Sequence, residues 1–323
     1  MIIPLKTLGK KIVRRVAARL AMAVGDTLVT PAQNDILDPP PPDERGRYAA
    51  FVDSAARFNV KTLGVAGDYG LIQSAVDDIE ILGAYARTGH WARRTNGLLQ
   101  EFFGKHQVGS YIDVGANIGL TTIPVAQWRG VSCLAVEADP TNYQHLVANV
   151  AANCPHGNVV TRHQAVFSKR CSVQFEISHE NRGDHRIRLS SGPGALKEEL
   201  RHVISVDALP LDEMAPPLAG AVAIKVDTQG AEPFVIEGGT RTFSRADLLI
   251  LEIWPYGLAR LGGNPDLIVR LVRDNFQTAT IGLGEEETFT PSTPASMVTA
   301  ELERMINTKQ NDTSYYLDVV AWR

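Results

Sequence analysis

The sequence lacks the features that mark three common classes of protein. Its three cysteines, Cys133, Cys154 and Cys171, form no CxxC pair and are odd in number, so we expect unbridged thiols in a reducing compartment. No apolar run approaches the roughly 18 residues of a membrane-spanning helix. A formal net charge of −4 argues against a dedicated nucleic-acid binder, which would carry a basic excess. The 323 residues, 44% of them hydrophobic, predict a cytoplasmic globular protein with one large domain, or one domain and an extension.

Residues 1–30 are predicted to contain a basic amphipathic helix. Six lysines and arginines and no acid precede Asp26, and apolar residues repeat at helical spacing. Charges interrupt any apolar core, so the segment is a poor signal peptide. Two hypotheses stay open for residues 1–24: peripheral contact with a membrane surface or a partner, and packing on the protein's own surface. A third, a mitochondrial presequence, has no independent support in the sequence.

Two further segments precede the most regular part of the chain. Residues 31–46 are predicted to be a linker, because four consecutive prolines favour extended polyproline II structure. Residues 47–108 are predicted to form a cap of about two helices, since apolar residues recur at spacings of three and four from Leu71 to Ala86.

From residue 109 to residue 323, short apolar runs alternate with helical segments. This alternation is typical of an α/β fold with a doubly wound, mostly parallel sheet. The first of seven expected strands ends at Asp113, and the others cover 131–136, 159–167, 221–226, 247–253, 277–283 and 314–322. A polar hairpin is expected at 172–189, a short strand at 203–209, and acidic and polar loops between the last two strands.

The stretch SYIDVGANIGLTT, residues 110–122, predicts a ligand site. An apolar strand stops at Gly115, and a helix start follows Gly119, so the backbone can bend sharply and a ligand can approach it closely. A dinucleotide fingerprint would place glycine where Asn117 stands. The carboxylate of Asp113 opposes a pyrophosphate and suits a ligand with an ammonium or sulfonium, such as S-adenosylmethionine (SAM). A purely structural strand-to-helix turn stays open as the alternative.

Four acidic residues fall at predicted strand ends: Asp113, Glu137, Asp227 and Glu252. Carboxylates at the rim of a buried sheet cost desolvation energy unless a cation, a hydroxyl pair or a metal compensates them. Glu137 lies 18 residues after Gly119, where an acidic side chain can reach a ribose diol. No ligand-rich spacing supports a metal, so none is predicted.

The motifs IDVGANIGLT, AVEADPTN and IKVDTQGAE, in this order, resemble the FkbM-type family of SAM-dependent methyltransferases over residues 109–254. The resemblance implies a class I methyltransferase fold and O-methylation of a sugar, glycolipid or polyketide-like small molecule. It implies contacts with the methionine end of SAM through the first motif, with the ribose through Glu137, and with the adenine through Ala138, Gln164 and Ala165. The implied cofactor residues are Asp113, Gly115, Ala116, Asn117, Gly119, Glu137, Ala138, Gln164, Ala165 and Asp227.

Methyl transfer to an alcohol also needs a proton acceptor. Asp227 is the first candidate and Glu232 the second, with His179 and His185 of the hairpin after them. Asp227 has an equal alternative in orienting the turn or the SAM amine, and Glu232 has one as a helix-start residue. Two other functions stay open: a SAM- or sugar-binding regulatory or scaffold module without turnover, and an NAD-dependent sugar-modifying enzyme, which Asn117 disfavours.

Overall fold

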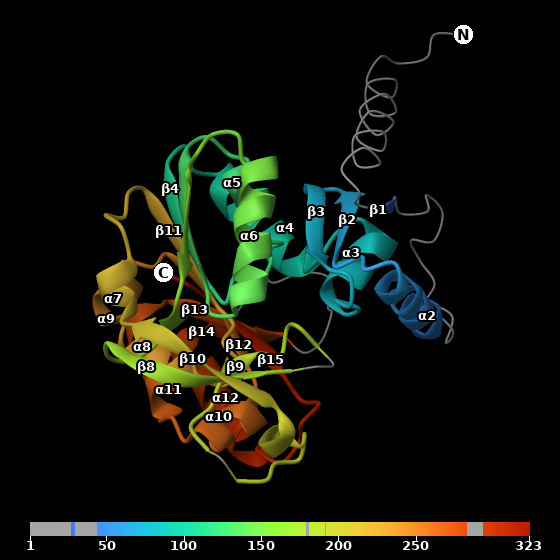
Figure 1. Cartoon of the computed structure of the whole chain (residues 1–323). Helices are drawn as coiled ribbons and strands as arrows, with labels where there is room; N and C mark the ends of the chain where they lie inside the picture. The colour runs from blue at the N-terminus through green and yellow to red at the C-terminus, as the bar shows by residue number, and fades with distance from the viewer. Residues whose placement is uncertain (1–26, 30–43, 179–180, 191, 283–292) are drawn as a thin grey trace. The chain divides into compact units, whose positions relative to one another are not determined.

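The computed structural model describes residues 27–29, 44–178, 181–190, 192–282 and 293–323 (Figure 1). The basic segment 1–24 and most of the proline-rich linker lie outside these residues. The chain divides into two compact units, Met1–Trp91 with Ala151–Asn153, and Ala92–Val150 with Cys154–Arg323. Among the described residues, no helix is both long enough and apolar enough to cross a membrane.

The first unit contains a small sheet in the order β1-β2-β3, so the N-terminal extension is not purely helical. Its elements are β1 (Thr27–Val29), α2 (Glu44–Arg57), β2 (Thr62–Gly67), β3 (Gly70–Ala75) and α3 (Ile81–Thr88). The predicted helix from Leu71 is therefore wrong over its first five residues. There Val65 pairs with Ile72 in an antiparallel hairpin, and both side chains are fully buried. A short apolar run fits the period of a helix as well as that of a strand, and β-branched residues at paired positions favour the strand.

The second unit is built on an eight-stranded sheet in the order β14-β13-β15-β12-β11-β4-β5-β6 (Figure 1). The strands are β4 (Gly109–Val114), β5 (Val131–Glu137), β6 (Val159–His163), β11 (Ala221–Val226), β12 (Leu248–Ile253), β13 (Thr278–Gly282), β14 (Thr293–Pro294) and β15 (Leu317–Trp322). The five strands from β12 to β6 are parallel, and β15 is antiparallel to β12 and β13. The predicted α/β, doubly wound, mostly parallel fold is confirmed. The count is eight rather than seven because the two-residue strand β14 extends the edge.

A separate four-stranded sheet, in the order β7-β10-β8-β9, is inserted after β6. It consists of β7 (Ala165–Val166), β8 (Cys171–Ile177), β9 (Arg186–Ile187) and β10 (His202–Leu209). The predicted hairpin is confirmed as the antiparallel pair β8 and β9. The single strand predicted at 159–167 is wrong, because the chain changes sheets at Gln164. Its N–H still bonds to Glu137 O, but Ala165 then pairs with Ala208 of β10.

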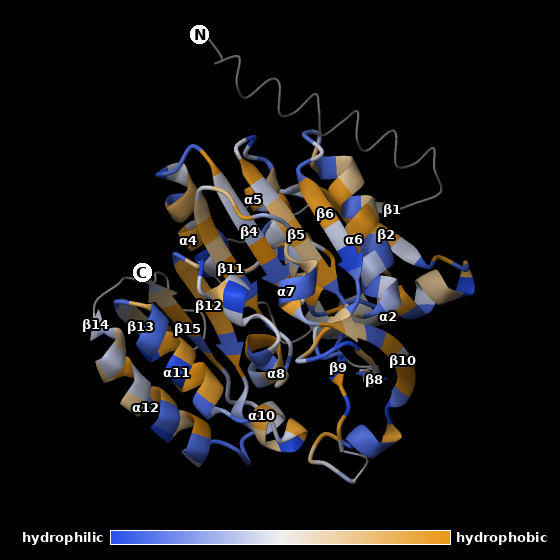
Figure 2. Ribbon diagram, turned by 90° about the vertical axis from the view of Figure 1, so that its left-hand side faces the viewer, coloured by the Kyte–Doolittle hydropathy of each residue, from blue (hydrophilic) through white to orange (hydrophobic). Residues whose placement is uncertain are grey.

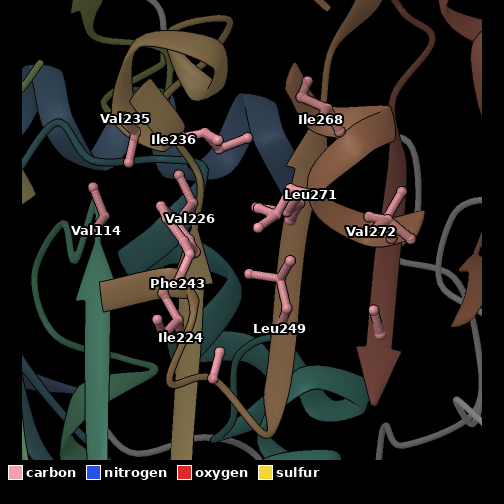
Figure 3. Packing of buried hydrophobic residues seen from close by; sticks show 14 of the residues in the cluster. Val114, Ile224, Val226, Val235, Ile236, Phe243, Leu249, Ile268, Leu271 and Val272 are labelled. Carbon is pink, nitrogen blue, oxygen red and sulfur yellow. The ribbon is translucent and has the colours of Figure 1, made fainter. Parts of the chain in front are cut away.

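Helices cover the large sheet and bury its apolar strands. They are α4 (Arg93–Gly104), α5 (Thr122–Ala126), α6 (Pro140–Asn153), α7 (Leu211–Met214), α8 (Glu232–Glu237), α9 (Thr240–Phe243), α10 (Pro255–Leu261), α11 (Asp266–Asn275) and α12 (Ala295–Thr308). Figure 3 shows Val235 and Ile236 of α8 beside Val226 of β11, within one continuous buried cluster. This packing fixes the carboxyl end of β11, where Asp227 follows.

The polar loops predicted between the last two strands are wrong over residues 295–308, which form α12. In Figure 2, α11 and α12 each combine orange hydrophobic and blue hydrophilic residues. In α12 the buried residues Val298, Leu302 and Ile306 recur every four positions. The acidic and basic residues between them lie on the other face of the helix. Their number makes the segment look like a polar loop in the sequence.

Candidate functional site

Two backbone turns meet at the carboxyl edge of the large sheet: residues 115–119 after β4, and residues 227–232 after β11. Gly115 has φ +82°, and a Cβ placed there would lie 1.9 Å from Asp227 O. The N–H groups of Gly115 and Ala116 both donate to Val136 O over 3.0 Å. Gly119, with φ +96°, packs against Leu146, whose Cδ1 would lie 2.9 Å from a Cβ. The glycines therefore let protein segments pack closely around the turn.

Each turn also holds a non-glycine residue in the left-handed region. Asn117 has φ +51° and Gln229 has φ +55°. Asn117 Oδ1 accepts a bond of 2.8 Å from Ile118 N, and its Nδ2 donates to Arg182 O over 3.1 Å. Such conformations persist only where surrounding contacts hold them, and they concentrate at functional sites.

Asp113 is fully buried at the end of β4. Its Oδ2 accepts bonds from the hydroxyls of Thr121 and Thr122, at 2.6 and 2.7 Å. Its Oδ1 accepts no hydrogen bond and lies 3.9 Å from Lys225 Nζ. The register of β4 and β11 pairs Asp113 with Lys225, which explains their proximity. One carboxylate oxygen thus orders the start of α5, and the other faces a cation.

Glu137, the last residue of β5, connects that strand to the glycine turn. Oε2 accepts a bond of 2.7 Å from Asn117 N, and Oε1 accepts one of 2.8 Å from Asp139 N. The side chain is only 6% exposed, and burial raises the pKa of Glu137 to about 7 despite these donors. Each oxygen retains a second lone pair for a further hydrogen bond.

The three residues expected near the adenine have different surroundings. Ala138 is half-buried, and its carbonyl oxygen lies 3.2 Å from His163 Nε2. The His163 ring stacks on Tyr143 with ring centroids 4.9 Å apart. Gln164 is half-buried and bonds to the strand end at Glu137 O, whereas Ala165 is buried in the apolar cluster of the inserted sheet. Ala138 and Gln164 thus lie beside Glu137, and Ala165 lies behind them.

Asp227 belongs to a charged group at the ends of β11 and β12, and 27% of its side chain is exposed. Its Oδ1 accepts a bond of 2.8 Å from Gln229 Nε2, which also donates to Glu252 Oε1 over 2.8 Å. Its Oδ2 lies 3.3 Å from Lys225 Nζ. Burial raises the pKa of Glu252 well above its usual range, and electrostatic repulsion from Asp227 adds to the effect. Burial opposes the charge of Lys225, but the surrounding carboxylates outweigh it and raise the pKa of this lysine.

Glu232 is fully buried at the start of α8. Its Oε1 accepts bonds from Thr228 N at 3.0 Å and from Thr228 Oγ1 at 2.9 Å, and Gly230 N donates to Oε2 over 3.1 Å. Burial raises the pKa of Glu232 to about 7. Because these bonds all lie within its own turn, the geometry favours the helix-start role over the catalytic one.

Of the two candidate histidines, His179 lies outside the described residues. His185 is 8% exposed, and burial lowers its pKa to about 4, so the imidazole is neutral at physiological pH. A buried ring of such low basicity is a poor general base.

A buried ionic cluster around Arg186 was not predicted from the sequence. The guanidinium is 1% exposed, donates to Glu176 Oε1 over 2.8 Å and to Glu198 Oε1 over 3.1 Å, and also bonds Asp184. Its Cζ lies 4.6 Å from the centroid of the Trp254 ring, directly after β12. The cluster therefore fixes the inserted sheet to the segment that follows β12. The available signal was the register Glu176–Arg186 across the hairpin, which places opposite charges on one face.

The acids expected at the sheet edge form two groups. Asp113, Asp227 and Glu252 form one group, in which the first two lie near Lys225 and Gln229 joins the last two. Glu137 stands apart at the end of β5, where it bonds to the glycine turn. Within the part of the chain that the structure describes, no three or more His, Cys, Asp or Glu side chains are placed to hold a metal ion.

The parallel strands β6-β5-β4-β11-β12, the antiparallel β15 beside β12 and the glycine turn after β4 have the arrangement of the Rossmann-like class I methyltransferase fold. Residues 113–261 match the profile of the family described as Methyltransferase FkbM domain. The resemblance is thus confirmed for this segment, which matches the FkbM methyltransferase family. It contains both turns, Glu137 and the inserted sheet. No curated protein matches the chain.

Three solved structures illustrate what the chain is similar to. TYW2 of M. jannaschii, in complex with AdoMet, is 13% identical, with a TM-score of 0.39 over 81% of this chain and 85% of that one. Magnesium protoporphyrin IX methyltransferase of Synechocystis PCC 6803, with bound SAM, is 14% identical, with a TM-score of 0.36 over 71% and 77%. Precorrin-6y C5,15-methyltransferase of Geobacter metallireducens GS-15 is 12% identical, with a TM-score of 0.35 over 71% and 87%.

Proposed function

We propose that the protein is a SAM-dependent O-methyltransferase that acts on a hydroxyl of a sugar, glycolipid or polyketide-like small molecule. The observation that carries the proposal is the bond between Asn117 N and Glu137 Oε2. It joins the turn after β4 to the acidic end of β5, the two elements that bind a nucleoside in this fold class.

The residues present fit SAM better than a dinucleotide. A buried carboxylate oxygen of Asp113 lacks a hydrogen-bond donor, and Asp227 lies nearby with Lys225 as the cation between the two acids. An ammonium and a sulfonium suit this excess of negative charge, whereas a pyrophosphate would face repulsion. SAM supplies the electrophilic methyl group when it is bound.

Asp113, Gly115, Ala116, Asn117 and Gly119 are proposed to shape the methionine end of the cofactor site. Glu137 is proposed to accept hydrogen bonds from the ribose hydroxyls through its free lone pairs. Ala138 and Gln164 are proposed to border the adenine, with Ala165 supporting them from the apolar cluster.

Asp227 is proposed to accept the proton of the acceptor hydroxyl. Its side chain is partly exposed at the sheet edge, and its Oδ2 lies 3.3 Å from Lys225 Nζ, which holds the carboxylate in place. A general base must be able to reach the acceptor hydroxyl, and Asp227 is partly exposed whereas Glu232 is fully buried. We therefore propose that Glu232 orders the turn 227–232.

The inserted sheet and the loops after β11 and β12 are proposed to form the acceptor pocket. The support is the Arg186 cluster, which attaches the insertion to Trp254 close to the end of β12. The methyltransferase domain is proposed to begin at Ala92 rather than at residue 109, because α4 belongs to the same compact unit as the large sheet.

The segment 1–24 is proposed as a peripheral membrane contact, supported by its basic amphipathic sequence. Deletion of residues 1–24 should then release the protein from anionic liposomes. Failure of the full chain to bind such liposomes would refute this proposal.

The proposed activity is tested by ligand-induced stabilisation followed by turnover. In differential scanning fluorimetry, SAM and S-adenosylhomocysteine should stabilise the protein by about 2.7 kcal/mol at a hundredfold excess over Kd, and NAD and NADP should not. Methyl-labelled SAM, incubated with the protein and a glycan extract, should then yield a labelled, base-stable ether product. Stabilisation without any labelled product would favour a binding module instead.

A further inference from the structure

His185 carries a buried donor without an acceptor. Its Nδ1 accepts a hydrogen bond of 3.0 Å from Ser178 N, so this nitrogen carries no proton. The ring is neutral, because burial lowers the pKa of His185 to about 4. The proton of a neutral imidazole must then be on Nε2. That atom is buried and has no hydrogen-bond partner.

A buried acceptor without a donor lies on the neighbouring helix. Asn142 Nδ2 donates to Arg182 O over 3.1 Å, which fixes the orientation of the amide. Asn142 is 1% exposed, and its Oδ1 has no hydrogen-bond partner. Unpaired buried polar atoms cost free energy, and they are rare unless a ligand or water completes them.

Both residues lie where the hairpin loop meets the glycine turn and the start of α6. Arg182 O accepts one bond from Asn142 and one from Asn117, whose own N–H bonds Glu137. His185 lies near Asp139, whose charge partly offsets the effect of burial on the pKa of this histidine. Asp139 in turn donates its N–H to Glu137 Oε1. The hairpin loop that carries His185 is therefore connected, through Arg182 O and its two asparagine donors, to both sides of the Glu137 carboxylate.

We propose that His185 is a cofactor-binding residue whose Nε2–H donates a hydrogen bond to the nucleoside part of the bound cofactor. This inference rests on the proposed function, and it assigns the inserted hairpin a part in cofactor binding. Ribose oxygens and adenine ring nitrogens are acceptors of the required kind. The unpaired Oδ1 of Asn142, near the start of α6, provides an acceptor beside the same hairpin loop.

Two substitutions separate ligand binding from folding. His185→Asn keeps an acceptor near the position of Nδ1 for Ser178 N and removes the Nε2–H. His185→Gln places an amide donor near the position of Nε2 and removes the acceptor. The exposed His202 of β10 supplies the matched control, His202→Asn. The probe is S-adenosylhomocysteine, with Kd from isothermal titration calorimetry and Tm of the ligand-free protein.

We expect His185→Asn to weaken S-adenosylhomocysteine about fivefold, the effect of one neutral hydrogen bond, with Tm within about 3 °C of wild type. His185→Gln should keep the affinity within about twofold and lower Tm, because Ser178 N loses its acceptor. His202→Asn should change neither quantity. Equal affinity of wild type and His185→Asn would overturn this inference alone, as would an affinity loss confined to His185→Gln. No binding by wild type would overturn the proposed function as well.

Discussion

Asn117 N donates a hydrogen bond of 2.7 Å to Glu137 Oε2, across the gap between the turn after β4 and the end of β5. The bond fixes the carboxylate while leaving one lone pair on each oxygen free. A carboxylate held in this way can accept two hydroxyl donors without rearrangement. This relationship makes the ribose assignment testable through the properties of Glu137.

The first prediction concerns pH. The pKa of Glu137 is raised from 4.5 to about 7 by burial, so between these values the folded protein binds a proton that the unfolded chain does not. The contribution of Glu137 to the free energy of unfolding therefore falls with rising pH, by about 1.4 kcal/mol per pH unit. Glu137→Gln removes this dependence. Urea denaturation of wild type and variant at about pH 5 and about pH 7 should show wild type losing stability relative to the variant.

Other titrating groups, including Glu232 and His185, are present in both proteins and cancel in this difference. A difference that stays constant across the pH range would show that Glu137 titrates normally in the folded protein.

A second prediction separates catalysis from binding at Asp227. Asp227→Asn keeps the shape of the side chain and removes its capacity to take a proton. Turnover should fall by about 10²–10⁴-fold, the usual contribution of a general base, with the Kd for SAM changed by less than about fivefold. The exposed Asp207→Asn on β10 is the control and should change neither. If turnover and affinity fall together, Asp227 is a binding residue.

The third prediction concerns the meeting of the two turns. Gly115→Ala would place a Cβ 1.9 Å from Asp227 O at φ +82°, so the backbone must shift. We expect a loss of more than about 3 kcal/mol in the free energy of unfolding, or failure to fold. Gly97→Ala in α4 is the matched control. Its Cβ meets nothing within 4 Å, and it should stabilise the protein by about 0.5–1 kcal/mol in urea denaturation.

Arg186 gives the fourth prediction. Arg186→Met leaves Glu176 and Glu198 buried without their central cation, so the free energy of unfolding should fall by about 3–5 kcal/mol. Arg241→Met removes an exposed ion pair with Asp212 and should cost at most about 1 kcal/mol. Equal losses for the two variants in urea denaturation would show that the buried cluster contributes no more than a surface pair.

The sequence predicts the strand ends well because the apolar runs stop abruptly at Asp113, Glu137 and Asp227. Packing on both faces of a parallel sheet requires such runs, so the order of the strands and helices can be predicted from the sequence. The residues that pair with these acids cannot be predicted in this way. Lys225 faces Asp113 only because β4 and β11 are neighbours in the sheet, a pairing between distant segments.

The same reason explains the errors at Gln164 and Arg186. The chain leaves the large sheet at Gln164 because Ala165 finds a partner in β10, more than one element away. Arg186 is buried because Glu176, Glu198 and the nearby Asp184 all pair with it. Helical or strand periodicity does not show either contact, and only the pairing of Glu176 with Arg186 across the hairpin points to the second.

The most direct test of the central claim is isothermal titration of S-adenosylhomocysteine into wild type and Glu137→Ala. We expect one site per chain in wild type and at least a tenfold weaker Kd in the variant, since hydrogen bonds to a charged group are worth about 1.5–3 kcal/mol. An unchanged Kd in Glu137→Ala would contradict the ribose assignment, and binding of NAD in place of S-adenosylhomocysteine would contradict the methyltransferase account.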